Sequence, residues 1–563
     1  MSSRRKGKAW LLSASAAMLI TTVACSSNDG PNAATSTAAP SSGASAVAPE
    51  GTKDTQAEIN LKAYPEPVTV TIGATVGAGI NYPEGESVDD NIHTRLNKEM
   101  LNIEYKNKFV VEASKLSEKI NLAIASDDLP DVLLVGTEQM QKMVKNDQLA
   151  DLSQVYDQYA SAELKRNLEY QNKVSFVPAE TDGKLYGIPA PKDYGNSIPV
   201  MYVRQDWLDA LGLEPPKTMD ELTAVAKAFV EKDPDKNGQK DTFAISLESG
   251  MNTLAMDAIA SAFGAYPSIM VKDASGRIVY GSTQPEMKEA LKKMQELYKL
   301  GAFDPEFGIK DYAVTVEKIM AGKVGILFGA FWNPLYPLKQ NLENDPNAKW
   351  NAYPIPTLDG GTPVPKALPF TNEWIVVRKA FAHPEAIVKS MNLWTDMFIS
   401  SKPELFPEAQ KRWYEAIGST HKGLEAHNYA RPFFFDSPFG NLEVGRELRE
   451  YHASNDESKL VSAKAKDVFT NQIKPGGLQA WAMEKMYYEA EAVLDGYKEL
   501  VYPAYVGAST PTMLSKGPTL GKLESETFVN IIMGASLDTF DAFVEKYHKL
   551  GGDDILKEIN AQK

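Results

Sequence analysis

One short stretch, KDPDKNGQKDTF (residues 232–243), carries oxygen-bearing side chains at every second position. Counted from Asp233 as position 1, they fall at positions 1, 3, 5, 7 and 9, and Gly238 at position 6 permits a sharp bend. Calcium takes six to eight oxygen ligands in a flexible geometry, and the residue at position 7 of a calcium loop offers its backbone carbonyl. The spacing therefore predicts a calcium loop whose ligands are Asp233, Asp235, Asn237, Gln239 and Asp241.

This stretch differs from a helix–loop–helix calcium site in two respects. Position 12, where such a site has a bidentate glutamate, is Ala244. Residues 243–247 alternate like a strand, so no exit helix follows. A calcium sensor needs a paired helix that opens, so the role expected for calcium here is to fasten a turn between a helix and a strand. An acidic surface turn without metal is the alternative interpretation.

A helix is expected directly before the loop. Thr218 and Glu221 have the spacing of a capping box, in which the two side chains satisfy free amides at the start of a helix. Leu222, Val225 and Phe229 then recur on one face, which predicts a helix that runs to about residue 232.

The only cysteine, Cys25, follows a stretch with the features of a secretory signal peptide. Basic residues lie between positions 4 and 8, and residues 9–24 form an apolar run, shorter than the roughly 20 residues of a membrane span. Residues 22–25, TVAC, resemble a bacterial lipobox, with threonine where leucine is usual. We therefore expect residues 1–24 to be a signal peptide and Cys25 to carry a lipid, such as palmitate. Plain cleavage near Ala24, with a free thiol, is the alternative.

Residues 25–58 are mostly small or polar and cannot build a core. They predict a disordered tether with a reach of roughly 30 Å. The folded body is then expected at the extracellular face of the bacterial cell membrane, held there by its lipid.

Length and charge narrow the possible functions. The 563 residues suffice for two to four domains, and the contents of 43% hydrophobic and 24% charged residues are typical of a soluble globular protein. The net charge of −15 speaks against a nucleic-acid-binding protein and against broad electrostatic docking on an anionic membrane. A single cysteine excludes an intrachain disulfide.

The body begins near residue 64 with alternating strand and helix patterns. Strands are expected at 67–73, 109–112 and 132–135, and helices at 91–100 and 115–126. The run at 132–135 is apolar throughout, as in a parallel strand buried on both faces. This alternation predicts an α/β layer architecture.

Five segments, in this order and spacing, resemble the extracellular solute-binding proteins of ABC importers. The resemblance is to family 1, in its lipoprotein oligosaccharide-binding branch, which includes the alginate-binding proteins, and it covers nearly all of the chain after residue 64. The segments are IASDDLPDVL (124–133), DGKLYGIP (182–189), MYVRQDWLDALGLEPPKTMDEL (201–222), FTNEWIVV (370–377) and TPTMLSKGPTLGKLESETFVNIIMG (510–534).

The resemblance implies a two-lobe, type II periplasmic-binding-protein-like α/β fold, with a ligand cleft between lobes joined by a hinge. The expected lobes are 59–199 with 372–430, and 200–371 with 431–563, and strands near 200–203 and 370–377 cross between them. The expected partners of this monomer are an oligosaccharide and the permease subunits of an ABC importer. In the alginate-binding relatives a similar loop holds structural calcium with a carboxylate at position 10, where this chain has Thr242.

Candidate ligand-binding residues follow from the chemistry of sugars, whose C–H faces suit aromatic rings and whose hydroxyls suit planar polar groups. Trp332 follows an apolar strand, in the place where α/β sheets bind ligands, and the family has a sugar-stacking tryptophan in a similar motif. Trp374 is the second candidate, with a packed interdomain tryptophan as its alternative. Tyr186 is equally compatible with a core position in a hairpin. Further candidates are Asn81, Tyr82 and Arg431, whereas Trp394, Trp413 and Trp481 lie in helical patterns and are expected in the core.

The alternative function is a secreted polysaccharide-degrading enzyme, either a lyase or a glycosidase. A glycosidase needs only two carboxylates, and the chain has many. The sequence contains no HExxH, GxSxG or phosphate-loop motif, and its six histidines have no metal-ligand spacing. An adhesion protein would usually show repeats, which this chain lacks. A binding protein is thus favoured over an enzyme, with the choice between an acidic and a neutral sugar left open.

Overall fold

The computed structural model describes residues 61–76, 82–248, 253–310, 312–368, 371–398, 406–417, 432 and 437–561. The predicted signal peptide and tether, with Cys25, lie outside these residues, as do Asn81 and Arg431. Of the helices in the described ranges, none combines the length and apolarity needed to span a membrane.

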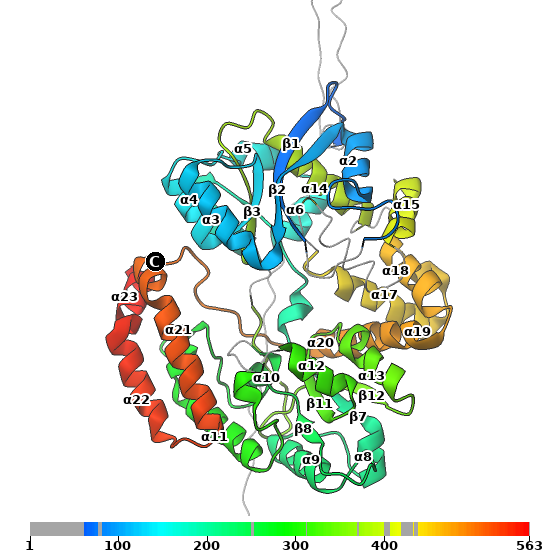
Figure 1. Ribbon diagram of the computed structural model, residues 1–563, viewed down its shortest axis with the longest axis vertical. Coiled ribbons are helices and arrows are strands. Elements are labelled where there is room, and N and C mark those ends of the chain that lie inside the picture. Colours follow the sequence, from blue (N-terminus) through cyan, green and yellow to red (C-terminus); the bar gives the residue numbers. More distant parts are fainter. Residues whose placement is uncertain are drawn as a thin grey trace, which may run out of the picture. The chain divides into compact units, whose positions relative to one another are not determined.

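The first sheet has five strands in the order β2-β1-β3-β13-β6; β1, β2 and β3 are labelled in the upper part of Figure 1. β1 pairs in parallel with β2 and β3, and β13 lies antiparallel between β3 and β6. Every second residue at the start of β1 is buried, and β13 is buried along nearly its whole length. The strands are β1 (Val68–Val76), β2 (Ile103–Glu112), β3 (Val132–Gly136), β6 (Ile188–Pro189) and β13 (Glu373–Val377).

Helices from residues 92–173 and from residues 385–417 cover the first sheet and share one core with it. Ile120 and Ile124 of α3, for example, are buried on the same helix face, as their spacing predicted. These helices are α2 (Ile92–Leu101), α3 (Leu116–Ser126), α4 (Thr137–Lys145), α5 (Ser153–Tyr159), α6 (Ala162–Leu168), α14 (Glu385–Phe398) and α15 (Pro407–Ile417), with the short α7 (Tyr170–Lys173) following α6.

The second sheet has the order β12-β7-β11-β8. β7 pairs antiparallel with β11 and β12, whereas β11 and β8 run in parallel. Every residue of β7 and β11 is buried, which explains their continuous apolar character. The strands are β7 (Val200–Arg204), β8 (Phe243–Ile245), β11 (Val324–Gly329) and β12 (Trp350–Tyr353), and two-stranded ribbons are formed by β4 (Glu180–Thr181) with β5 (Lys184–Leu185) and by β9 (Met270–Lys272) with β10 (Ile278–Tyr280).

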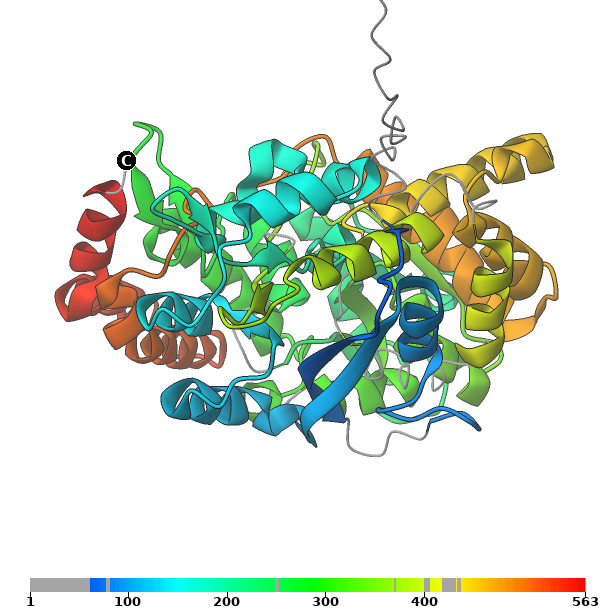
Figure 2. The ribbon, with the colours of Figure 1, turned by 90° about the horizontal axis from the view of Figure 1, so that it is seen from above.

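Two further cores flank the second sheet, one on each side of its strands. In the first core, α21 packs on α11 and α22, and Figure 2 shows the orange and red helices of the C-terminal part side by side. The helices of this core are α8 (Gln205–Leu211), α9 (Met219–Glu231), α10 (Leu254–Ala262), α11 (Pro285–Lys299), α21 (Pro511–Ile532), α22 (Asp538–Tyr547) and α23 (Asp553–Ala561). In the second lie α12 (Tyr312–Met320), α13 (Lys339–Asn344), α17 (Gly440–Ser454), α18 (Ala463–Asp467), α19 (Gly477–Glu484) and α20 (Glu491–Gly496).

The chain passes from the first sheet to the second between β6 and β7, and returns between β12 and β13. Both sheets are therefore built from segments distant in sequence. The residue limits of the two predicted lobes stay a prediction.

Candidate functional site

Trp332 lies just beyond the end of β11 and is partly buried. Its indole N–H donates to Oδ1 of Asn196, 2.8 Å away and on the solvent-exposed side. The backbone beneath the ring is fixed, because the buried Tyr202 hydroxyl donates to the carbonyls of Ala330 and Phe331 at 2.9 and 3.0 Å. Asn196 belongs to the short helical turn η3 (Tyr194–Ser197), on the passage between the two sheets. Trp332 is thus an oriented ring with exposed surface at that passage.

Trp374 occupies a different environment, and the structure argues against it as a ligand-binding residue. Only 2% of the residue is exposed, and its indole N–H donates to the carbonyl of Ser175 at 3.0 Å. A Cβ at Gly187 would meet the Trp374 side chain at 2.9 Å, so the neighbouring strand leaves no free space there. In this structure Trp374 is packed inside the first core, and is not the interdomain tryptophan of the alternative interpretation.

Tyr186 lies directly after the β4–β5 ribbon and is partly buried against the first core. The turn of this ribbon uses Asp182 and Gly183, both with positive φ. The amide of Tyr186 donates to the carbonyl of Ala179 at 2.9 Å. The ring both packs and keeps exposed surface, so its role as a ligand contact stays a prediction.

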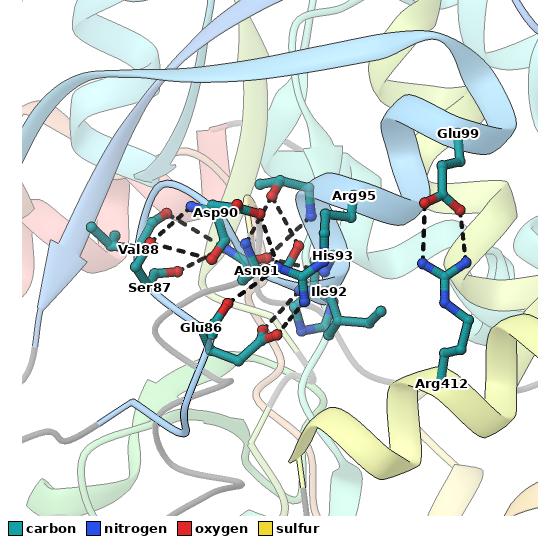
Figure 3. A network of polar contacts seen from close by, with 12 residues as sticks. Glu86, Ser87, Val88, Asp90, Asn91, Ile92, His93, Arg95, Glu99 and Arg412 are labelled. Carbon is teal, nitrogen blue, oxygen red and sulfur yellow. Dashed lines mark hydrogen bonds and ion pairs between the residues drawn. The ribbon is translucent and has the colours of Figure 1, made fainter.

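Tyr82, partly buried, lies in the segment that joins β1 to α2. Figure 3 shows the polar contacts that hold this segment. The side chain of Glu86, 5% exposed, accepts from the amide of Ile92 at 2.8 Å and pairs with Arg95. The side chain of Asn91 caps α2 by accepting from the amides of His93 and Thr94, and Arg95 also pairs with Asp90. Residues 86–95 are thereby held in place, while the ligand contact proposed for Tyr82 stays a prediction.

The three tryptophans expected in the core do pack there. Trp413 is buried in the first core, and Trp394 packs on it with ring centroids 5.6 Å apart. His93 of α2 completes this group, 5.3 Å from the Trp394 ring. Trp481 is partly buried against the core that contains α19.

The predicted calcium loop joins α9 to β8. The capping box is present, with Thr218 and Glu221 each accepting from the other's amide, and the helix ends at Glu231, one residue earlier than expected. β8 follows the loop, so its exit is a strand, as predicted. Gly238 has a φ of +76°, a value that favours glycine at this bend.

The loop's side chains converge on Asn237. Its amide nitrogen donates to Asp235 at 2.8 Å and to Asp241 at 3.1 Å, while its oxygen accepts from the amide of Gln239 at 2.7 Å. The carboxylate of Asp233 accepts from the amides of Asn237 and Gly238 at 3.2 and 3.0 Å. Asp235 and Asp241 thus share the side-chain nitrogen of Asn237, whereas Asp233 is held by backbone amides.

Two carboxylates of the loop, those of Asp235 and Asp241, differ in how their negative charge is balanced. Burial and the neighbouring carboxyl of Asp233 raise the pKa of Asp235. The ammonium of Lys323, 2.7 Å from Asp241, lowers the pKa of that carboxyl. Oδ1 of Asp235 is buried and has no hydrogen-bond partner among the described residues.

The donors are of the kind that calcium prefers, but the loop as folded here does not close around an ion. Across the described residues, no three His, Cys, Asp or Glu side chains are placed to hold a metal. Position 12 is Ala244, fully buried in β8, and the hydroxyl of Thr242 donates to the carbonyl of Phe229 at 3.0 Å. Neither residue supplies the ligand that a tight site has there.

Sequence reasoning missed two residues, Asn196 and Lys323. Asn196 orients Trp332 from 136 positions earlier in the chain, and Lys323 reaches Asp235 from 88 positions away. Neither lies in a motif that would have indicated its role, since only the folded sheet brings these partners together.

Comparisons with known proteins agree with this architecture. A family model described as "Bacterial extracellular solute-binding protein" matches residues 80–396, more than half of the chain. Lipoprotein LipO of Bacillus subtilis (strain 168) is 24% identical over 461 residues, which cover 80% of this chain and 84% of LipO.

Two solved structures share the fold. The alginate-binding protein AlgQ2, solved without calcium ion, superposes with a TM-score of 0.59 at 17% identity, covering 88% of this chain and 98% of AlgQ2. The substrate-binding protein FusA of Streptococcus pneumoniae, in complex with kestose, gives a TM-score of 0.59 at 18% identity and the same coverages of 88% and 98%. These likenesses confirm the predicted two-lobe fold.

Proposed function

Because the chain belongs to the bacterial extracellular solute-binding proteins, we propose that it captures an oligosaccharide and delivers it to an ABC importer. FusA, a fructooligosaccharide ABC transporter substrate-binding protein, and AlgQ2, an alginate-binding protein, support this ligand class. The family and these relatives are binding proteins, so the alternative of a polysaccharide-degrading enzyme finds no support in them.

The observation that carries the proposal is the setting of Trp332. An aromatic ring binds the C–H face of a sugar only if it keeps exposed surface and a fixed orientation. Trp332 meets both requirements, since it is partly exposed and its N–H is held by Asn196. It also lies beyond a buried strand, where ligands of α/β proteins bind.

Capture is coupled to closure of the two lobes. The chain passes between the two sheets at about residues 190–199 and 354–372, and a hinge needs only a few residues that change their backbone dihedrals. A ligand that touches both lobes binds the closed form more tightly, and only that difference in affinity shifts the population. The importer can then recognise the closed, loaded form.

A lipid on Cys25 would keep the protein near its importer. The support is the lipobox-like TVAC at residues 22–25 and the name of the relative LipO, which is a lipoprotein. The tether at residues 25–58 would give the body its reach from the extracellular face of the membrane.

A structural calcium ion in the loop at 233–244 belongs to the same proposal. Asp233, Asp235 and Asp241 would hold it with their carboxylates, joined by the carbonyl of Gln239 and, after the amide has turned over, by the oxygen of Asn237. The ion would fasten the turn between α9 and β8. FusA has an EF-hand, because an EF-hand mutant of it has been solved with fructo-nystose.

A thermal-shift panel of neutral and acidic oligosaccharides tests the binding function. A true ligand at 100 times its dissociation constant should add about 2.7 kcal/mol to the free energy of unfolding. The sugar must also be recovered unchanged after long incubation. Shortened or unsaturated products would favour an enzyme, and a panel without any shift would reject this ligand class.

A further inference from the structure

Lys323 supplies positive charge to the loop at 233–244 from a distant part of the sequence. Its ammonium lies 2.7 Å from Oδ2 of Asp241 and 3.3 Å from Oδ2 of Asp235. The side chain of Lys323 is 29% exposed and that of Asp235 is 16% exposed, so this pairing is partly shielded from water. One lysine therefore bridges two of the loop's three aspartate carboxylates.

The backbone holds Lys323 in this position. The residue forms the turn between α12 and β11, where its amide donates to the carbonyl of Lys318 at 3.0 Å. Its own carbonyl accepts from the amide of Phe243 at 2.8 Å, and β11 pairs with β8 from the next residue on. The start of β8, which is the exit of the loop, is thus fixed directly beside Lys323.

The loop's own lysines do not share this arrangement. Lys236 and Lys240 are exposed, and neither pairs with a carboxylate in the described part of the chain. Lys240 nevertheless directly precedes Asp241 in the sequence. It is therefore a matched control for Lys323, with the same charge in the same loop but without the bridging contact.

Nearly every oxygen of the loop's carboxylates already has a donor. Asp233 accepts from two backbone amides, and Asp235 and Asp241 share Lys323 and the amide nitrogen of Asn237. Asn237 presents that nitrogen, and not its oxygen, to the centre of the loop. The loop is therefore closed by protein groups alone.

We propose that Lys323 is an internal cation of this loop: it holds the turn together without calcium, and it must leave Asp235 and Asp241 before the loop can take the ion. The second half of this inference rests on the calcium site proposed above. The role proposed for Lys323 does not depend on sugar binding, since the loop lies between α9 and β8 and does not include Trp332.

The test compares Lys323→Gln, Lys323→Arg and Lys240→Gln with the wild type by calcium titration calorimetry. Removing a charge about 3 Å from two ligands should tighten calcium binding by about tenfold in Lys323→Gln, after discounting for its partial exposure. Lys240→Gln, which changes the net charge equally, should stay within about twofold of the wild type. Lys323→Arg keeps the positive charge, so its calcium affinity should also stay close to that of the wild type.

Melting curves in chelator and in calcium give the second readout. In chelator, Lys323→Gln should melt at a lower temperature than the wild type and Lys240→Gln, and calcium should restore it. If Lys323→Gln folds only in the presence of calcium, that result would also support the role of Lys323 in holding the turn without calcium.

Two results would overturn the inference. Equal calcium affinities for Lys323→Gln and Lys240→Gln, with the wild type binding calcium, would show that Lys323 does not compete for the site. No calcium binding by any variant would reject displacement together with the calcium site itself. Sugar affinity at saturating calcium should be unchanged in every variant, so neither result bears on ligand capture.

Discussion

Trp332 and Trp374 have similar surroundings in the sequence but differ in burial in the structure. Each follows or lies within an apolar strand, next to an asparagine or glutamate, near a passage between the two sheets. Trp374 is 2% exposed and donates to a backbone carbonyl, whereas Trp332 keeps exposed surface and donates to a side chain. One ring is packed in a core, and the other keeps the exposed surface that its proposed role requires.

The difference arises from where each residue stands relative to the end of its strand. Trp374 is the second residue of β13, which has β3 on one side and β6 on the other, so neighbours cover the ring. Trp332 lies three residues beyond the end of β11, where the sheet has stopped and the chain turns. An aromatic residue beyond a strand end is thus a better ligand candidate than one inside the strand.

The largest expected effect is on stability. Trp374→Ala removes a fully packed ring and should lower the free energy of unfolding by about 3–5 kcal/mol. Chemical unfolding measured by circular dichroism checks this, with Trp374→Phe as the milder control. A loss below about 1 kcal/mol would mean that the ring is not packed as described.

Trp332→Ala should have the opposite profile. We expect a loss of about 1–3 kcal/mol in sugar-binding free energy, if stacking on this ring resembles the stacking of other planar groups on aromatics. The melting temperature of the sugar-free protein should change little, because the ring is only partly buried. Wild-type affinity in a folded Trp332→Ala variant would remove Trp332 from the site.

A smaller effect separates the stacking ring from its orientation. Trp332→Phe keeps an aromatic face but loses the N–H bonded to Asn196, and Asn196→Ala loses the same bond from the other side. Each should weaken sugar binding by about 0.5–1.5 kcal/mol, the usual net value of one hydrogen bond. Losses as large as that of Trp332→Ala would show that Asn196 itself binds the sugar.

Calcium removal should have the smallest effect on stability, and it should leave the difference between Trp332 and Trp374 unchanged. Chelator should lower the melting temperature of the wild type slightly, since Lys323 still holds Asp235 and Asp241. Asp233→Ala should abolish that difference, and sugar affinity should stay the same throughout. If chelator weakens sugar binding as much as Trp332→Ala does, the loop reaches the ligand site.

Local signals in the sequence predicted the structure well. The capping box at Thr218 and Glu221 and the apolar run that became β3 both depend on residues close in sequence. The start of β2 was missed: it begins at Ile103 and not at residue 109. As an edge strand, β2 keeps Glu104, Lys106 and Lys108 at least partly exposed, so its first half looks like a polar surface segment.

The site was harder to predict than the fold, because its contacts join distant segments. The sequence indicated Trp332 and the acidic loop, but not Asn196 or Lys323, which complete them from elsewhere in the chain. It also gave no means of separating Trp332 from Trp374, since burial depends on which strands become neighbours.

The central claim is that one oligosaccharide is held between two lobes that close on it. Small-angle scattering of the protein, with and without a saturating sugar from the thermal-shift panel, tests this claim directly. We expect a smaller radius of gyration with the sugar, and no change with a sugar that does not bind. An unchanged radius at proven saturation would contradict closure of the lobes around the ligand.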